Sequence, residues 1–154
     1  MSAVLKPVTP RLVPMTSADL GQVMLIEDAV YEFPWTRGNF EDSMSAGYSC
    51  WLYADGAELV GYCVIMLAVD EAHLLNLSIA GDWQGQGHGR ALLNLAMDVI
   101  KAHGAKAMLL EVRPSNIAGR ILYSRAGFSQ VGLRKSYYPA QAGREDALVL
   151  KRAL

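Results

Sequence analysis

The stretch from residue 71 to residue 113 constrains the fold of this chain most strongly. An apolar segment over 71–80 is followed by a glycine-rich run, "DWQGQGHG", at 82–89. Apolar residues then recur at helical spacing over 90–105, and a second apolar segment covers 106–113. Two strands linked through a helix need a crossover connection, and such connections join parallel strands. The stretch therefore predicts one parallel strand pair.

The rest of the chain predicts antiparallel strands and further helices. Segments 48–54 and 58–69 are rich in β-branched and aromatic residues and flank Asp55-Gly56, a strong hairpin signal. The other regular patterns are strands over 11–15, 131–139 and 145–154, and helices over 16–31 (capped by Thr16 or Ser17), 33–47 (capped by Thr36) and 115–128. The predicted fold class is α/β (α+β), with a mixed, mostly antiparallel sheet of seven strands and about four helices.

Composition limits the kind of molecule this is. The 154 residues are 52% hydrophobic and 19% charged, which indicates one globular domain over 1–154. The net charge is −1 and no block of Lys or Arg occurs, so the charge pattern gives no reason to expect nucleic acid as a partner. The apolar run 59–69 is too short to span a bilayer, and the N-terminal segment lacks an apolar signal core. We expect a cytoplasmic protein that is not a membrane protein.

The two cysteines, Cys50 and Cys63, are too few for a disulfide framework. No Cys or His spacing is typical of a metal site, so no metal is expected. We expect both thiols to be reduced and buried as small apolar side chains. The sequence indicates no particular oligomeric state.

The glycine run predicts an anion-binding turn. Gly85, Gly87 and Gly89 allow positive φ angles and a close backbone approach, so successive N–H groups can point at one anion. The N-terminus of the following helix adds partial positive charge. Arg90 and His88 are candidates for a side-chain contribution. The alternative is a flexible turn without a ligand, since a glycine loop alone is a weak signal.

A dinucleotide-binding fold is a rival interpretation of the same run. Glu111 follows about twenty residues later, near the distance at which an acid contacts a ribose in that fold. The spacing here is G-x-G-x-G, however, one residue short of the dinucleotide pattern, and the run follows several strands rather than the first. We therefore expect a phosphate group but not a dinucleotide.

Glu111 is the one carboxylate in the apolar strand "AMLLEV". A buried glutamate is costly unless it is paired or used, so we interpret it as functional. A desolvated carboxylate there would be suited to accept a proton near neutral pH. The alternative is a salt bridge, with Arg113 as the nearest basic residue in the sequence.

Tyr123 lies twelve residues after Glu111, in a short predicted helix. Core packing is the ordinary role of a helical tyrosine. The alternative is a phenol that donates a proton to a leaving group, since its reference pKa of about 10 keeps it protonated at neutral pH. Asn116 precedes the helix and is expected to cap it, or else to bond the amide of a ligand.

Four blocks of the sequence together resemble the GNAT acetyltransferases. They are "FPWTRGNF", "NLSIAGDWQGQGHGRALL", "LEVRPSNIAGRILYSRAGF" and "RKSYYPAQAGREDALVL", in the family's order. Gln84, Gly87 and Gly89 match the Q/R-x-x-G-x-G/A loop that holds the pyrophosphate of acetyl-CoA in that family. The likeness runs from Leu12 to the end of the chain. It is strongest to the group that acetylates the N-terminal alanine of ribosomal proteins.

The resemblance implies the GNAT fold, whose parallel strand pair splays apart, and a set of site residues. Glu111 matches the family's proton acceptor, and Tyr123 matches the proton donor to the CoA thiolate. The residues implied to bind acetyl-CoA are Leu77, Ser78 and Ile79 through their backbone, Gly85, Gln86, Gly87, His88, Gly89 and Arg90 in the pyrophosphate loop, and Asn116. The family usually has two basic residues where this chain has Gly85 and Gln86, so weaker CoA binding or a shifted pyrophosphate is expected.

The implied activity is acetyl transfer from acetyl-CoA, as co-substrate, to an N-terminal alanine amine of a small-subunit ribosomal protein. We expect direct transfer in a ternary complex, with a two-step route through Cys63 as the alternative. Other hypotheses are acetylation of a small amine or a lysine side chain, and a non-catalytic acyl-CoA sensor. The candidates for holding the ribosomal protein's N-terminal peptide are the aromatic residues Tyr31, Phe33, Trp35, Tyr137 and Tyr138 and the acidic residues Glu32, Glu41 and Asp42.

Overall fold

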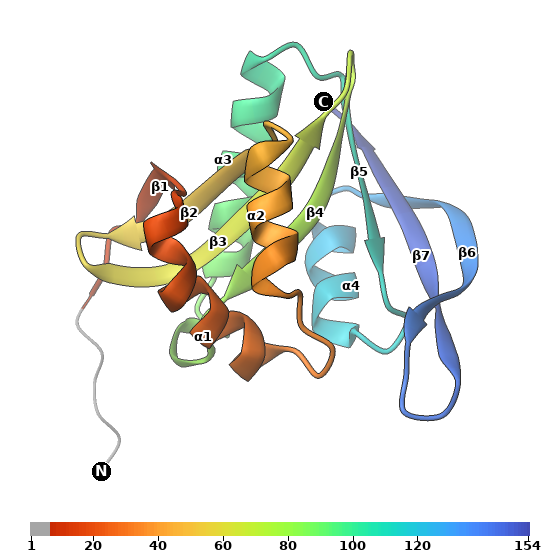
Figure 1. Ribbon diagram of the computed structural model, residues 1–154. Coiled ribbons are helices and arrows are strands. Elements are labelled where there is room, and N and C mark those ends of the chain that lie inside the picture. Colours follow the sequence, from red (N-terminus) through yellow and green to blue (C-terminus); the bar gives the residue numbers. More distant parts are fainter. Residues whose placement is uncertain (1–6) are drawn as a thin grey trace.

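Figure 1 shows the computed structural model of the protein, which describes residues 7–154. Seven strands form one sheet in the order β1–β2–β3–β4–β5–β7–β6. Their bounds are β1 Arg11–Pro14, β2 Ser49–Asp55, β3 Glu58–Leu67, β4 Glu71–Ile79, β5 Ala107–Val112, β6 Ser129–Pro139 and β7 Arg144–Ala153. Every neighbouring pair is antiparallel except β4 and β5. The predicted mixed sheet, the hairpin at Asp55-Gly56 and the single parallel pair are confirmed.

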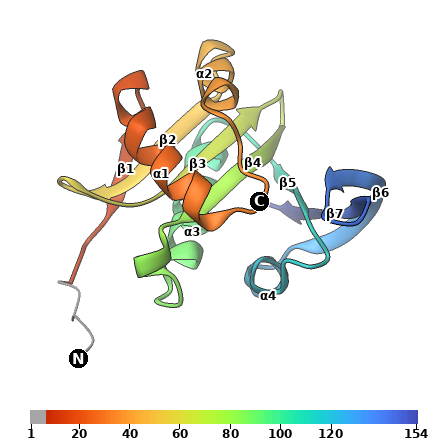
Figure 2. The same cartoon turned by 60° about the horizontal axis from the view of Figure 1, so that its bottom comes forward.

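Four α-helices cover the two faces of the sheet (Figures 1 and 2). They are α1 Leu20–Val30, α2 Arg37–Ser45, α3 His88–Ala102 and α4 Ile117–Arg125. Helices α1 and α2 lie on one face, where Leu20 and Phe40 pack against Tyr62. Helices α3 and α4 lie on the other, where Leu92 and Leu93 of α3 belong to the main core. Within residues 7–154, no helix has the length and apolar character needed to cross a membrane.

Two predicted helix starts are displaced in the structure. The segment after Thr16 first makes a 3₁₀ turn, Ser17–Asp19, so α1 begins only at Leu20. Helix α3 begins at His88 rather than residue 90, because Gly87 has a φ of 86° and is the N-cap residue. The anion-binding turn is thus shorter than predicted, and His88 to Arg90 form the first helical turn. The helix-capping roles of Thr36 and Asn116 are confirmed.

Strands β4 and β5 are paired over only about the first half of β4. Its register runs from Glu71 opposite Ala107 to Leu74 opposite Leu110, and then stops. Strand β4 continues along β3 to Ile79, with a register shift opposite Val64 and Ile65 of β3. A bulge bends a strand, which here turns the second half of β4 away from β5. The splayed pair is therefore confirmed, and Figure 1 shows α4 beside the opening.

Candidate active site

The open edge of β4 presents N–H groups while its carbonyls are occupied. The N–H of Ala80 donates to a β3 carbonyl at 2.8 Å, so by strand alternation Leu77 and Ile79 direct their backbone groups away from β3. The Leu77 carbonyl accepts from the Tyr31 hydroxyl at 3.2 Å, and the Ile79 carbonyl accepts from Gln84 Nε2 at 3.0 Å. The outward N–H groups of these two predicted residues suit an extended ligand that offers carbonyl oxygens.

Ser78, the third predicted residue of this strand, is held by its side chain. Its hydroxyl donates to Asn76 Oδ1 at 2.6 Å and lies 2.6 Å from the Tyr31 hydroxyl. Burial raises the pKa of Tyr31 to about 12, so the phenol stays protonated and acts as a donor. Tyr31 therefore ties the end of α1 to β4 through its hydroxyl, while the side chain stays partly exposed.

Glu27 is a buried carboxylate that the sequence analysis missed. It is 1% exposed, and Oε1 accepts from the Tyr62 hydroxyl at 2.7 Å and from Asn76 Nδ2 at 3.1 Å. Oε2 accepts from the Trp35 backbone N–H at 2.9 Å. Its position seven residues after Leu20, on the apolar stripe of α1, was the signal that could have found it. Glu27 joins α1, the α1–α2 loop and the bulged part of β4.

Replacement of Glu27 by Ala is expected to lower the free energy of unfolding by about 3 kcal/mol or more, since two buried donors and one partly buried donor lose their acceptor. Urea unfolding measures the change. Asp28→Ala is the matched control, because Asp28 is exposed on the next position of α1 and should change stability by less than about 0.5 kcal/mol. Equal losses of unfolding free energy in the two variants would show that the hydrogen bonds of Glu27 do not stabilise the fold.

Gly61 of β3 permits the close approach of β4. A Cβ at this position would lie 2.4 Å from the Ser78 carbonyl oxygen and 2.7 Å from Ile79 Cδ1. Gly61→Ala is expected to cost about 1–3 kcal/mol and to weaken acetyl-CoA binding, because β4 must shift. Gly21→Ala is the control, since its Cβ meets nothing within 4 Å and helix propensity favours Ala. Calorimetric titration of both variants with acetyl-CoA measures the effect, and unchanged affinity in the Gly61 variant would contradict it.

The glycine turn has the backbone conformation that an anion site needs. Gly85 and Gly87 have φ angles of 73° and 86°, which favour glycine over any other residue. Gln86 Nε2 donates to the Asp82 carbonyl at 3.0 Å and so stabilises the turn. Neither Gly85 nor Gln86 carries a basic side chain, so backbone N–H groups are the donors that the turn itself offers.

The side chains that follow the turn make contacts within the protein. The His88 ring packs edge-on to Tyr53 and Trp83, with centroids 5.9 and 5.8 Å away. Arg90 Nη1 donates to the Arg125 carbonyl at 3.2 Å, which links α3 to the end of α4. An added Cβ on Gly89 would lie 3.6 Å from Leu122 Cδ2, an ordinary contact distance, so Leu122 of α4 lies next to this position. His88 and Gly89 are thus placed to offer backbone groups to a ligand.

Asn116 and Tyr123 lie on α4 beside the splay. Asn116 Oδ1 accepts from the Gly119 N–H at 3.0 Å, as expected of a cap. The Tyr123 ring packs edge-on to Phe128 at 5.7 Å. Burial raises the pKa of Tyr123, with smaller contributions from Tyr31 and Tyr138. Within residues 7–154 no group bonds the Tyr123 hydroxyl and no buried side-chain oxygen lacks a partner, so this hydroxyl faces accessible space.

Glu111 is paired by two residues that the sequence analysis did not place with it. Its side chain is 9% exposed, and Arg134 Nε lies 3.2 Å from Oε1. His73 Nε2 bonds Oε2 from β4. Arg113, the partner considered from sequence, instead lies 3.2 Å from Glu145. Glu111 is thus paired, but its partners differ from the predicted one, because they come from β4, which neighbours β5, and from β6, which lies beyond β7 in the sheet order.

The two predicted peptide-binding segments meet across Arg113. Its guanidinium carbon lies 5.2 Å from the Phe33 ring centre in the α1–α2 loop and 4.3 Å from that of Tyr138 in β6. The charge of Glu111 raises the pKa of Tyr138, after the larger effect of burial. The Arg113 side chain thus brings the α1–α2 loop and β6 together.

Cys63 is unsuited to a two-step route. Its side chain is fully buried, and burial raises the pKa of its thiol to about 12. The thiolate is the nucleophilic form, so a protonated thiol in the core cannot accept an acetyl group. Cys50 is also a free cysteine, as predicted, but it is only partly buried, so the prediction that both thiols are buried is wrong for Cys50.

Known proteins are similar to this chain in both fold and sequence. A profile of the acetyltransferase (GNAT) family matches residues 20–128. The [ribosomal protein bS18]-alanine N-acetyltransferase of Escherichia coli K12 is 33% identical over 136 residues, which cover 88% of this chain and 92% of that protein. The crystal structure of the ribosomal-protein-S18-alanine N-acetyltransferase from Escherichia coli gives a TM-score of 0.87 at 31% identity, over 94% of both chains.

A more distant structure shares the fold alone. Naa50 of Arabidopsis thaliana, in complex with the bisubstrate analogue CoA-Ac-MVNAL, gives a TM-score of 0.81 at 20% identity over 96% of this chain and 100% of that one. The splayed sheet, the open edge of β4 and the glycine turn thus define an acyltransferase that takes its acetyl group from acetyl-CoA. The chain belongs to the GNAT family of acetyltransferases. Within that family it is similar over most of its length to the Escherichia coli bS18-alanine enzyme.

Proposed function

We propose that this enzyme acetylates the N-terminal alanine amine of a small-subunit ribosomal protein, the counterpart of bS18, in the cytoplasm. The observation that carries the proposal is the opening between β4 and β5: Glu111 is the first β5 residue beyond the pairing, β4 turns its Leu77 and Ile79 N–H groups outward, and α4, which contains Tyr123, lies beside it (Figure 1). The likeness to the bS18-alanine enzyme at 33% identity supports the choice of acceptor. We propose that the whole chain, 1–154, works as one domain.

Acetyl-CoA is proposed to enter through the splay, with its pyrophosphate at the turn formed by Gly85 and Gly87. Its amide-bearing arm would lie along β4, where the N–H groups of Leu77 and Ile79 bond the arm or the thioester oxygen. Asn116 and the first turn of α3 are the other proposed contacts with acetyl-CoA. The proposed place of the arm fits its chemistry. The Leu77 and Ile79 carbonyls already accept hydrogen bonds from protein groups, so they would not repel the carbonyl oxygens of acetyl-CoA.

Transfer is proposed to be direct, within a ternary complex. A free α-amine has a pKa of about 7.7–8, so part of it is neutral at pH 7 and can attack the thioester carbonyl. As the new N–C bond forms and the C–S bond breaks, Tyr123 gives its proton to the leaving sulfur and the amine loses its proton towards Glu111. Alignment of the two reactants can contribute on the order of 7 kcal/mol.

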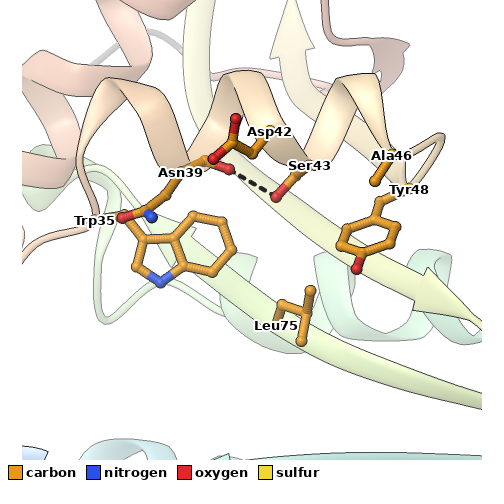
Figure 3. Close-up of a pocket in the computed structure, with 7 residues that line it drawn as sticks. All are labelled: Trp35, Asn39, Asp42, Ser43, Ala46, Tyr48 and Leu75. Carbon is orange, nitrogen blue, oxygen red and sulfur yellow. Dashed lines mark hydrogen bonds between the residues drawn. The ribbon is translucent and has the colours of Figure 1, made fainter.

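The acceptor peptide is proposed to lie between the α1–α2 loop and β6, over Phe33, Tyr137 and Tyr138. A cavity of about 460 Å³ opens beside that loop (Figure 3). It is lined by Trp35, Asn39, Asp42, Ser43, Ala46, Tyr48 and Leu75. Two of the three candidate acids already have partners in the protein, because Glu41 pairs with Arg37 at 3.1 Å and Glu32 accepts a hydrogen bond from Gln141. Asp42 is therefore the proposed partner of a basic side chain in the peptide.

Peptide acetylation tests the proposal. The enzyme is incubated with acetyl-CoA and peptides that begin with alanine, and with the same peptides N-blocked but carrying lysine. Mass spectrometry of the products should find acetyl groups on the free alanine amine only. Acetylation confined to the blocked lysine peptides would overturn the proposed acceptor. Binding of acetyl-CoA with no turnover of any amine would point to a sensor instead.

A further inference from the structure

We infer that His73 and Glu111 form one proton-accepting unit, in which Glu111 fixes the ring and His73 Nδ1 receives the proton from the acceptor amine. The inference rests on the proposed function, because it names the group at that site that takes the proton. It changes the role of Glu111 from terminal acceptor to the partner that orients the acceptor. No pattern in the sequence singled out His73, whose role follows from a contact between two strands.

The contact with Glu111 sets which ring nitrogen of His73 carries hydrogen. His73 Nε2 bonds Glu111 Oε2, while Arg134 Nε donates to Oε1 from 3.2 Å. An ionised carboxylate only accepts hydrogen bonds, so Nε2 must be the donor. In the neutral ring the lone pair is then on Nδ1. A carboxylate that fixes a histidine tautomer in this way leaves the other nitrogen free to act as a base.

Nδ1 is the more accessible of the candidate acceptors. No group in residues 7–154 bonds it, and no buried side-chain nitrogen in that part of the chain lacks a partner, so Nδ1 reaches accessible space. The His73 side chain is 24% exposed, against 9% for Glu111. Both Glu111 oxygens already accept a bond from a neighbour. The imidazole therefore offers an unoccupied lone pair to an amine, or to a water that it contacts, whereas both carboxylate oxygens are already bonded.

His73 also lies at the point where the strands separate. It is opposite Leu109, one residue before Leu74 and Leu110 end the parallel pairing. The thioester is proposed to lie in the opening that starts there. The imidazole thus lies in the last paired stretch, next to Glu111, which is the first β5 residue beyond the pairing with β4, whereas Tyr123 is carried by α4.

The proton transfer balances on these groups. When the amine nitrogen has bonded the acetyl carbon, its N–H bond breaks and the electron pair stays on nitrogen. The proton goes to His73 Nδ1, directly or through one water, and the imidazolium keeps its Nε2–H against the negative Glu111. The proton then leaves from Nδ1 to solvent. As the C–S bond breaks, the CoA sulfur keeps the electron pair and takes the Tyr123 proton, and the phenolate is reprotonated from solvent.

The tautomer of His73 tests the first half of the inference. The chain has three histidines, so nitrogen-15 spectra of the full-length protein resolve each ring, with His73→Gln to assign the signal. His73 is expected in the Nε2–H form, and Glu111→Ala should abolish that preference. Hydrogen on Nδ1 alone would overturn the inference.

Steady-state kinetics test the second half. His73→Gln keeps an N–H donor towards Glu111 but has no basic nitrogen, so kcat should fall about 100-fold with the KM for acetyl-CoA unchanged. His73→Ala should regain activity with added imidazole but not with pyrazole, which has the same shape and is a far weaker base. His103→Ala is the control, because His103 is exposed at the end of α3. Full activity in His73→Gln, or equal rescue by both compounds, would overturn the inference.

The design separates this inference from the proposed function. If the wild-type enzyme acetylates lysine rather than the α-amine, the proposed acceptor fails, and the His73 variants are then assayed on that lysine peptide. If the α-amine is acetylated and His73→Gln is fully active, only the inference fails. No turnover with any amine would overturn both.

Discussion

Glu111→Gln is expected to lower kcat by at least about 100-fold while leaving the Kd for acetyl-CoA unchanged. The amide has nearly the shape of the carboxylate, but it carries no charge to stabilise a protonated partner. One of its two contacts, to His73 or to Arg134, must also be lost, since the NH₂ group cannot accept a bond. Steady-state kinetics with an alanine-initiated peptide measure kcat, and calorimetric titration measures acetyl-CoA binding.

Glu71→Gln is the matched control for that variant. Glu71 is at the start of β4 and lies 3.6 Å from Lys151, in a partly exposed ion pair away from the splay. Loss of such a pair changes stability by only about 0–1 kcal/mol, so kcat should stay at the wild-type value. Wild-type turnover in Glu111→Gln would remove this carboxylate from the reaction.

Tyr123→Phe is expected to reduce kcat by about 100-fold, again with little change in acetyl-CoA binding. The substitution removes only the hydroxyl, and the ring can keep its packing against Phe128, so the free energy of unfolding should not fall. Because burial raises the pKa of Tyr123 above its ordinary value of 10.0, the wild-type hydroxyl stays protonated up to that pH. Loss of the donor should therefore lower the rate by the same factor at every pH between 7 and about 9.

Tyr53→Phe is the control for the hydroxyl. Tyr53 is a buried tyrosine of β2 whose ring contacts His88, on the sheet away from α4. Loss of the Tyr53 hydroxyl should leave kcat within a factor of about two of the wild-type value, because Tyr53 lies away from the reacting groups. The role of Tyr123 as proton donor would be refuted if its Phe variant turned over as fast as this control.

Local patterns were enough to predict the order of the elements. The 71–113 stretch predicts the parallel pair, and Asp55-Gly56 predicts the hairpin, because turn and helix signals act over a few residues. Alternation also marked Glu111 as unusual, since one acid among apolar neighbours is visible in the sequence. The start of α3 was misplaced by two residues, since a glycine can end a turn or cap a helix and only its φ of 86° decides.

Partners across strands could not be predicted in the same way. Period-two alternation places His73 and Glu111 on faces of their own strands, but which residues meet depends on the register of β4 against β5. Arg134 reaches Glu111 only because β7 lies between β5 and β6 in the sheet order. Glu27 lies on the apolar stripe of α1, which the sequence shows. Its three hydrogen-bond donors come from the α1–α2 loop, β3 and β4, and the sequence does not show that these segments meet.

The sequence by itself determined the element order, the parallel pair, the glycine turn and the one acid of β5. The tertiary structure alone decided how far β4 and β5 stay paired, which carbonyls of β4 are occupied, and that His73 and Arg134 hold Glu111. The reason is the range of the forces involved. Turn geometry and hydrophobic periodicity depend on neighbouring residues, whereas register, a bulge and a buried hydrogen-bond network form only when distant segments pack together.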